Sequence, residues 1–144
     1  MSDEFTLSIP VRFRDIDRLN HVNNAVYSTY LEEARFAYLE SVLDVDVTEF
    51  ELVIVNLELS FRRPISLDDD LEVAVSVTDL GETSWTMDYE FRVDGSVVAT
   101  GETTNVHFDP ETDRPKPLPA EIREPLLERE PGLEAGSLDE NDAS

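Results

Sequence analysis

The order of apolar patterns along this 144-residue chain predicts an α+β domain, in which a curled antiparallel sheet wraps around one long helix. Three observations carry this prediction: an alternating pattern near the N-terminus, one long helical pattern after it, and then four consecutive strand patterns. Each strand has one apolar face that needs covering. A helix that is apolar around much of its circumference can cover these faces if the sheet curls around it. The length fits a single domain with its own core.

The first two elements follow from their periodicity. Apolar residues alternate with mostly polar ones from Phe5 to Phe13, which predicts a half-buried strand. Pro10 lies inside this run, and because proline has no backbone N–H, we expect an edge strand, or at least that this position lies outside the ladder. From about Asn24 to Val42 apolar residues recur at spacings of three and four without glycine or proline, which predicts the long helix.

The remaining strands follow a polar connection after the helix. Their patterns cover Leu52–Phe61, Leu71–Val77, Trp85–Val93 and Val97–Phe108. Asp94-Gly95 is typical of a tight hairpin turn between the third and fourth of these strands.

Prolines, glutamates and small residues take over after the last strand. We therefore expect a domain over residues 1–118 and an acidic tail over residues 119–144. In that tail, residues 119–130 are expected to form a short surface helix and residues 131–144 to be disordered.

Charge and composition exclude several classes of protein. The formal charge of −22 results from 33 acidic against 11 basic residues, so neither nucleic acid nor an anionic membrane is expected as a partner. We interpret this charge as a halophilic adaptation to a cytoplasm of very high salt, where screening removes the self-repulsion. The absence of cysteine excludes disulfides and cysteine nucleophiles. No stretch approaches the roughly 20 apolar residues that span a bilayer, so we expect a cytoplasmic protein.

The segment just before the predicted helix carries the chemistry. Asp15 and Asp17 are two residues apart, so in an extended chain they would point the same way, and His21 follows them. Asn23 and Asn24 stand where the helix should begin and are typical of a helix cap. A carboxylate beside the free N–H donors of a helix N-terminus suits acyl transfer, because the donors stabilise an oxyanion while the acid acts as base or nucleophile.

These residues resemble the signature of the hot-dog-fold acyl-CoA thioesterases, specifically the 4-hydroxybenzoyl-CoA thioesterase-like group. The matching positions are Val11–Phe13, Asp15–Asp17, His21–Asn24, Tyr27, Tyr30 and Glu33–Arg35, followed by a second signature at Phe61, Pro64, Asp69 or Asp70, and Leu71. The similarity extends from about Phe5 to Phe108. It implies a hot-dog fold, a curled sheet around a central helix, and hydrolysis of an acyl thioester to a free acid and a thiol.

The resemblance also implies roles for single residues. Asp17 falls on the family's catalytic carboxylate, which attacks the thioester carbonyl or activates a water, and the backbone N–H of Asn24 would polarise that carbonyl. The basic residues that would bind the phosphates of coenzyme A are Arg62 and Arg63. No metal and no redox cofactor is required, since coenzyme A is part of the substrate. An acyl-CoA is the expected small-molecule partner, and a homodimer or homotetramer the expected assembly.

The chain departs from the family pattern at two places. Asn20 stands where many relatives have glycine, and we expect it to keep the same turn because asparagine tolerates left-handed backbone. A glycine of the second signature is replaced within Ser66 to Asp69.

Other readings of the motif stay open. Asp15, Asn23 and Tyr27 are expected to be structural parts of the motif. His21 is a candidate for the catalytic set, since histidine is the residue type that most often acts as a general base, although a lone loop histidine more often serves as a hydrogen-bonding scaffold. Glu33 on the helix is the alternative base, because a second hot-dog subgroup uses a helix glutamate. The rival functions are a non-catalytic acyl-CoA-binding module and a hot-dog dehydratase, which needs a histidine placed for proton abstraction.

Overall fold

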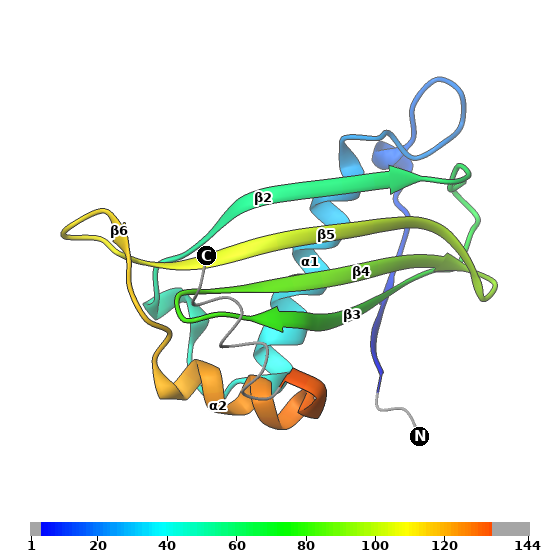
Figure 1. Ribbon diagram of the computed structural model, residues 1–144. Helices are drawn as coiled ribbons and strands as arrows, with labels where there is room; N and C mark the ends of the chain where they lie inside the picture. Colours follow the sequence, from blue (N-terminus) through cyan, green and yellow to red (C-terminus); the bar gives the residue numbers. More distant parts are fainter. Residues whose placement is uncertain (1–3, 134–144) are drawn as a thin grey trace. The chain divides into compact units, whose positions relative to one another are not determined.

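The computed structural model describes residues 4–133 and has the predicted order of elements (Figure 1). The helices are α1 (Val26–Val42) and α2 (Ala120–Arg129), with the short 3-10 helices η1 (Phe13–Asp15), η2 (Val47–Glu49) and η3 (Pro131–Leu133). The strands are β1 (Phe5–Ile9), β2 (Leu52–Phe61), β3 (Leu71–Leu80), β4 (Ser84–Val93), β5 (Ser96–Asp109) and β6 (Arg114–Pro115). Over the described range, no helix combines the length and the apolar character needed to cross a bilayer.

The strands form one sheet in the order β1-β3-β4-β5-β2, and β6 pairs with the end of β5 (Figure 1). β1 runs antiparallel to β3, with Phe5 opposite Val75 and Ile9 opposite Leu71. β1 and β2 are therefore the two edges of the main sheet, so the predicted edge position of the first strand is confirmed, and Pro10 follows directly after its end. The hairpin predicted at Asp94-Gly95 joins β4 to β5, with left-handed φ angles of 54° and 81° at its two residues.

The first strand is shorter than its sequence pattern predicts. β1 ends at Ile9, and the expected continuation to Phe13 is wrong, since Phe13 lies in η1 with 81% of its surface exposed. Pro10 explains the difference, because it has no N–H to offer to the neighbouring strand. The chain leaves the sheet there and enters the loop that leads to α1.

Contacts within the chain group it into two compact units, and the first contains Met1–Tyr38, Leu59–Val75 and Tyr89–Gly101. In this unit aromatic side chains of α1 pack against the strands. The ring centroids of Tyr27 and Phe91 are 5.4 Å apart, and those of Tyr38 and Phe5 are 5.5 Å apart in an edge-to-face arrangement. Such pairs add to the free energy gained by burying the rings themselves.

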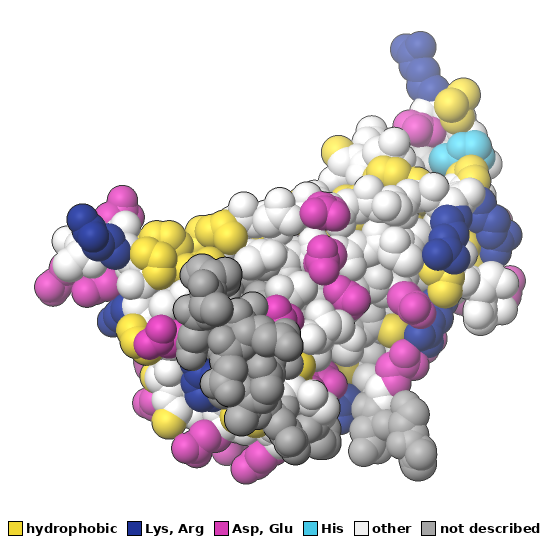
Figure 2. Space-filling view, in the orientation of Figure 1, with side chains coloured by type: hydrophobic (Ala, Val, Ile, Leu, Met, Phe, Trp, Pro, Cys, Tyr) yellow, Lys and Arg dark blue, Asp and Glu magenta, His cyan; other side chains and the backbone are white. Residues whose placement is uncertain are grey.

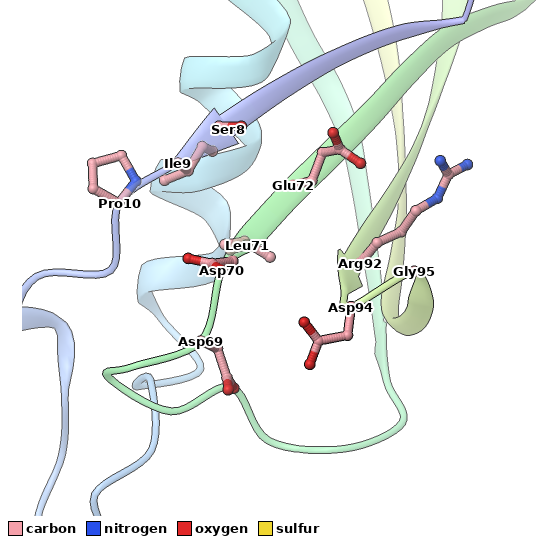
Figure 3. Close-up of a pocket in the computed structure, with 10 residues that line it drawn as sticks. All are labelled: Ser8, Ile9, Pro10, Asp69, Asp70, Leu71, Glu72, Arg92, Asp94 and Gly95. Carbon is pink, nitrogen blue, oxygen red and sulfur yellow. The ribbon is translucent and has the colours of Figure 1, made fainter.

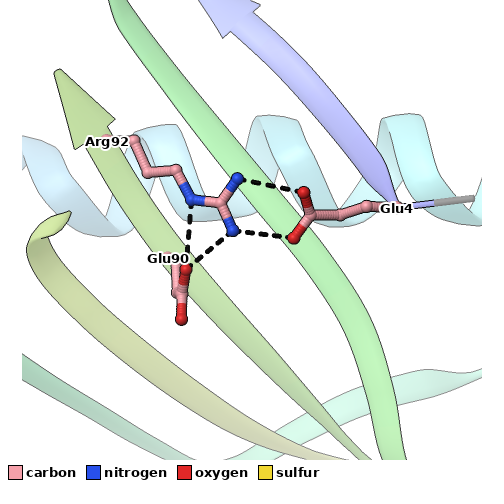
Figure 4. A network of polar contacts seen from close by, with 3 residues as sticks. All are labelled: Glu4, Glu90 and Arg92. Atoms are coloured by element: carbon pink, nitrogen blue, oxygen red, sulfur yellow. Dashed lines mark hydrogen bonds and ion pairs between the residues drawn. The ribbon is translucent and has the colours of Figure 1, made fainter. Parts of the chain in front are cut away.

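An ion-pair network on β4 ties the start of the described chain to the sheet (Figure 4). The Arg92 guanidinium makes two hydrogen bonds to Glu4, with distances of 3.0 and 2.7 Å, and also binds Glu90 at 2.7 Å. The hydrogen bond to Arg92 lowers the pKa of the Glu4 carboxyl from its usual value. This bidentate geometry holds the segment leading into β1 against β4.

The second unit contains Leu39–Glu58, Ser76–Asp88 and Glu102–Ser144, and α2 belongs to it. Ile122 and Leu126 of α2 are fully buried, so this helix, expected at the surface, contributes to a core. Its Arg123 guanidinium donates to the carbonyl oxygens of Gly81 and Glu82.

The C-terminal tail can be followed only in part. Residues 131–133, which the sequence assigns to a disordered tail, form η3, and Leu133 is buried. Residues 134–144 lie outside the described residues, so the expected disorder there and the expected domain boundary at residue 118 stay predictions.

Candidate active site

The loop between η1 and α1 forms a small antiparallel ladder. Its rungs are the hydrogen bond from the Asn23 N–H to the Asp15 carbonyl at 2.9 Å and that from the Asp17 N–H to the His21 carbonyl at 2.8 Å. A β-bridge between Ile16 and Val22 lies between these rungs. The ladder carries the central part of the predicted motif, with Asp15 and Asn23 at its base and Asp17 and His21 next to its tip.

The tip of the ladder is a tight turn. Asn20 has a φ of 68°, so the expectation that asparagine keeps a left-handed turn here is confirmed. The Asn20 N–H donates to the Asp17 carbonyl at 3.0 Å. One carboxylate oxygen of Asp17, Oδ1, accepts from the N–H groups of Leu19 at 2.9 Å and His21 at 3.3 Å. Within residues 4–133, the other oxygen, Oδ2, has no hydrogen-bond partner, so one oxygen orients the group and the second is available.

Asp15 is held differently from Asp17. Its carboxylate is buried, and its Oδ2 accepts from the Tyr30 hydroxyl at 2.6 Å and from the Arg12 N–H at 3.0 Å. Asp17 is exposed. The expectation that the two aspartates point the same way is therefore wrong. Ile16 between them is extended, but Asp15 itself is the last residue of the 3-10 helix η1, so the two aspartates do not belong to one continuous extended segment.

The residues after the ladder start the central helix. The Asn23 side chain accepts from the Ala25 N–H at 2.9 Å, and the Asn23 carbonyl accepts from the Val26 N–H at 2.8 Å, so Asn23 serves as the predicted cap. The N–H of Asn24 makes no hydrogen bond within residues 4–133. It is one of the free donors that every helix N-terminus presents, and it carries part of the positive end of the helix dipole.

A pocket of about 470 Å³ brings most of the predicted site residues together. Its lining consists of Asp17, Leu19, His21, Val22, Asn23, Asn24 and Tyr27 from the loop and α1, and of Phe61, Arg62, Arg63 and Pro64 from the end of β2. Asp17, which is exposed, and Asn24, at the start of the helix, therefore line one cavity. Asp15 does not line it, because its side chain is directed to Tyr30.

One part of this lining is apolar. The rings of Tyr27 and Phe61 meet edge-to-face with centroids 4.8 Å apart, and Phe61 remains 46% exposed. Burial raises the pKa of Tyr27, while a hydrogen bond with the Ile65 backbone lowers it in part, so its hydroxyl stays neutral at ordinary pH. Leu19 at the tip of the turn is 73% exposed beside the same cavity.

Another part of the lining is basic. The N–H groups of Arg62 and Arg63 both donate to the Val98 carbonyl, at 2.9 and 3.2 Å, which fixes their backbone where β2 ends. Their side chains are exposed, and no acidic partner for either one is found among the described residues. Figure 2 shows Lys and Arg side chains gathered at this end of β2, on a surface where acidic side chains are otherwise widespread.

The alternative base lies elsewhere. Glu33 pairs with the Arg12 guanidinium at 3.7 Å and does not line the pocket that contains Asp17. Glu33 therefore does not share a cavity with Asn24 at the start of the helix.

A second pocket, of about 500 Å³, lies where β1 ends and β3 begins (Figure 3). Two of its charged side chains have structural contacts: Asp69 accepts from the Ser66 N–H at 2.8 Å, and Arg92 is engaged by the ion pairs described above. It contains no residue of the first motif. Within the described part of the chain, no group of three or more His, Asp or Glu side chains is placed to hold a metal ion.

Sequence reasoning did not assign three residues that shape the site. Leu19 and Phe61 form its apolar edge, and Tyr30 holds Asp15. Leu19 had a signal in the sequence, since it is the one apolar residue between Asp17 and His21. The partner of Tyr30 had no such signal, because 15 residues separate it from Asp15.

Comparison with known proteins agrees with this geometry. The model of the thioesterase-like superfamily matches residues 11–126. The chain is 34% identical over 123 residues to the long-chain acyl-CoA thioesterase FadM of Escherichia coli (strain K12), covering 82% of this chain and 93% of that protein. It is 27% identical to a 1,4-dihydroxy-2-naphthoyl-CoA hydrolase of Synechococcus elongatus, with 79% and 88% covered.

A solved structure is similar over the same region. The crystal structure of a thioesterase from Thermus thermophilus, complexed with coenzyme A and Zn, superposes with a TM-score of 0.79 at 36% identity. The match covers 88% of this chain and 93% of that one. The α+β fold with its curled antiparallel sheet and long helix is thus the hot-dog fold predicted from the sequence. The chain belongs to the thioesterase-like superfamily, as its two motifs predict.

Proposed function

We propose that this protein is an acyl-CoA thioesterase in which Asp17 acts as base or nucleophile. The observation that carries the proposal is that Asp17 and Asn24 line the same pocket. The names of the relatives support the substrate class, since FadM acts on long-chain acyl-CoA and the Synechococcus enzyme on 1,4-dihydroxy-2-naphthoyl-CoA. The choice between an aliphatic and an aromatic acyl group stays open.

The geometry of Asp17 suits attack on a carbonyl carbon. Its Oδ1 is held by two backbone N–H groups, so Oδ2 is presented in a fixed direction. As a base, Oδ2 takes a proton from a water whose oxygen bonds to the thioester carbon; the C–S bond then breaks, and the proton passes to the leaving thiolate. As a nucleophile, Oδ2 bonds to that carbon directly, the thiolate leaves, and water later hydrolyses the mixed anhydride.

The Asn24 N–H is proposed as the donor to the oxyanion. It is free within the described residues and stands at the N-terminus of a helix of 17 residues. A negative charge that develops on the carbonyl oxygen gains from this donor and from the helix dipole. Removal of one such donor in other hydrolases costs about 10²–10³ in kcat.

Arg62 and Arg63 are proposed to bind the phosphates of the coenzyme. Both residues are exposed and line the pocket, and guanidinium groups match phosphate oxygens in a bidentate way. Coenzyme A is bound in the similar Thermus thermophilus structure. We also keep the proposal that no metal or redox cofactor takes part.

A homodimer is proposed through β2, and two such dimers can form the expected homotetramer. This strand is an edge of the sheet, and Val53, Val55 and Leu57 are 39%, 53% and 43% exposed. An edge strand with apolar side chains offers unpaired backbone groups to a second copy. Substitution of Val55 by Asp should lower the mass measured by sedimentation to that of one chain. An unchanged mass of two chains would show that the interface does not include β2.

The test of function is release of free thiol from a panel of acyl-CoA substrates in high salt. Asp17→Asn should lower kcat/KM by about 10²–10⁴ because a positioned base contributes that much. Glu33→Gln is the matched control, since it removes a carboxylate that the structure places outside the pocket. Full turnover by Asp17→Asn, or loss of turnover only in Glu33→Gln, would contradict the mechanism. Tight acyl-CoA binding by the wild type without turnover would indicate a binding module instead.

A further inference from the structure

We propose that Tyr30 is a positioning residue for the Asp17 carboxylate and the Asn24 N–H, acting through its hydrogen bond to Asp15. The inference rests on the proposed function, because it assigns these two groups to the reaction. Tyr30 does not line the pocket. Its effect therefore has to pass through the loop.

The hydrogen bond between Tyr30 and Asp15 is short and buried. The hydroxyl oxygen lies 2.6 Å from Asp15 Oδ2, Tyr30 has no exposed surface, and Asp15 has 7%. The Arg12 N–H donates to the same oxygen at 3.0 Å. Hydrogen bonds to a carboxylate are stronger than neutral ones, and in a buried place no water competes for them. The base of the ladder is thereby fixed to α1.

The strand of the ladder that carries Asp17 starts at this fixed point. Asp17 follows Asp15 by two residues, and its N–H is bound to the His21 carbonyl across the ladder. The opposite strand is held separately, because the Val22 N–H donates to the Ile65 carbonyl at 2.8 Å. Each strand thus has its own attachment, and the one that carries Asp17 depends on Tyr30.

The same hydrogen bond also constrains the helix donor. The Asp15 carbonyl accepts the Asn23 N–H at 2.9 Å, and the next N–H along the chain is that of Asn24, which stays free. Tyr30 lies on α1, the helix that Asn24 precedes. The Tyr30–Asp15 hydrogen bond therefore joins the two ends of the segment 15–30, and this segment contains both Asp17 and Asn24. Loss of the hydroxyl should let the distance between these groups vary.

The experiment compares Tyr30→Phe with Tyr38→Phe. Tyr38 is on the same helix and equally buried, but its ring packs on Phe5, away from the loop. With an acyl-CoA substrate well below the melting temperature, Tyr30→Phe should lower kcat roughly tenfold or more and leave KM within about twofold, because small misplacements near reacting groups are costly. Tyr38→Phe should leave both constants unchanged. Equal kcat values in the two variants would overturn the inference.

Asp15→Asn separates positioning from chemistry. Both donors bind one oxygen of Asp15, and the Oδ1 of an asparagine can accept both. Asp15→Asn should therefore keep kcat within about threefold, as a conservative rescue. A loss as large as that of Asp17→Asn would mean that the Asp15 charge acts on the reacting atoms, and the positioning role would be wrong.

Amide hydrogen exchange provides a readout that needs no turnover. The Asn23 N–H is bonded to the Asp15 carbonyl, so Tyr30→Phe should speed its exchange about tenfold, while Tyr38→Phe should not. A wild-type chain without thioesterase activity would overturn the proposed function but leave this measurement intact. Unchanged Asn23 exchange in Tyr30→Phe would overturn the inference, whether the chain is active or not.

Discussion

The base and the tip of the loop before α1 place two aspartates of one motif in opposite environments. At the base, Asp15 is buried and binds a side chain of α1 and a backbone N–H. At the tip, Asp17 is exposed and lines a pocket, and among residues 4–133 its carboxylate is bound only by backbone groups of its own turn. The difference shows how a short segment can separate the residue that shapes a site from the residue available for chemistry.

The largest expected effect is on stability at the base of the loop. Asp15→Ala leaves the buried Tyr30 hydroxyl and the Arg12 N–H without their acceptor, and should lower the free energy of unfolding by about 3 kcal/mol. Asp17→Ala removes only exposed hydrogen bonds and should cost about 1 kcal/mol or less. Urea unfolding measures the free energy of unfolding of both variants. Equal decreases would show that the hydrogen bonds of Asp15 do not stabilise the fold more than those of Asp17.

A smaller effect, on KM, is expected from the two arginines that line the pocket beside Asp17. Replacing Arg62 and Arg63 together by Gln should raise KM for an acyl-CoA about tenfold at low salt and leave kcat almost unchanged, because phosphate binding is the same in the ground and transition states. The increase should shrink in molar salt, where exposed charges are screened. A fall in kcat instead would place these arginines at the reacting atoms.

The smallest expected effect is on stability at Asn20, in the turn between Asp17 and His21. Asn20 has a φ of 68°, so Asn20→Ala should cost about 1 kcal/mol, whereas Asn20→Gly should change stability by less than about 0.5 kcal/mol. Thermal melting of the two variants gives the comparison. Equal melting temperatures would show that the turn does not need left-handed backbone.

The sequence could predict the elements because their side chains repeat with a regular period. β2 begins and ends where its apolar run predicts, and the helix expected from Asn24 begins at Val26. The hairpin at Asp94-Gly95 follows from local chemistry alone. The end of β1 was misjudged because alternation continues past Pro10 while the backbone pairing does not. β6 was missed because a strand of two residues has no period.

The candidate site was only partly predictable for a related reason. The resemblance grouped Asp17, Asn24, Arg62 and Arg63, and the structure shows that all four line one cavity. Spacing in an extended chain could not reveal that η1 turns Asp15 away from Asp17. Nor could it reveal that Glu33 is engaged by Arg12, because such a contact depends on where the loop crosses the helix.

The open edge of the sheet has a consequence for the newly made chain. Acidic side chains keep most of the surface soluble by mutual repulsion, but among its ten residues β2 carries a single charge, that of Glu58. If the proposed homodimer forms through β2, a chain that has folded and not yet met a second copy would expose this strand to any other unpaired strand. Expression yield should therefore depend on how quickly copies of the chain meet after synthesis.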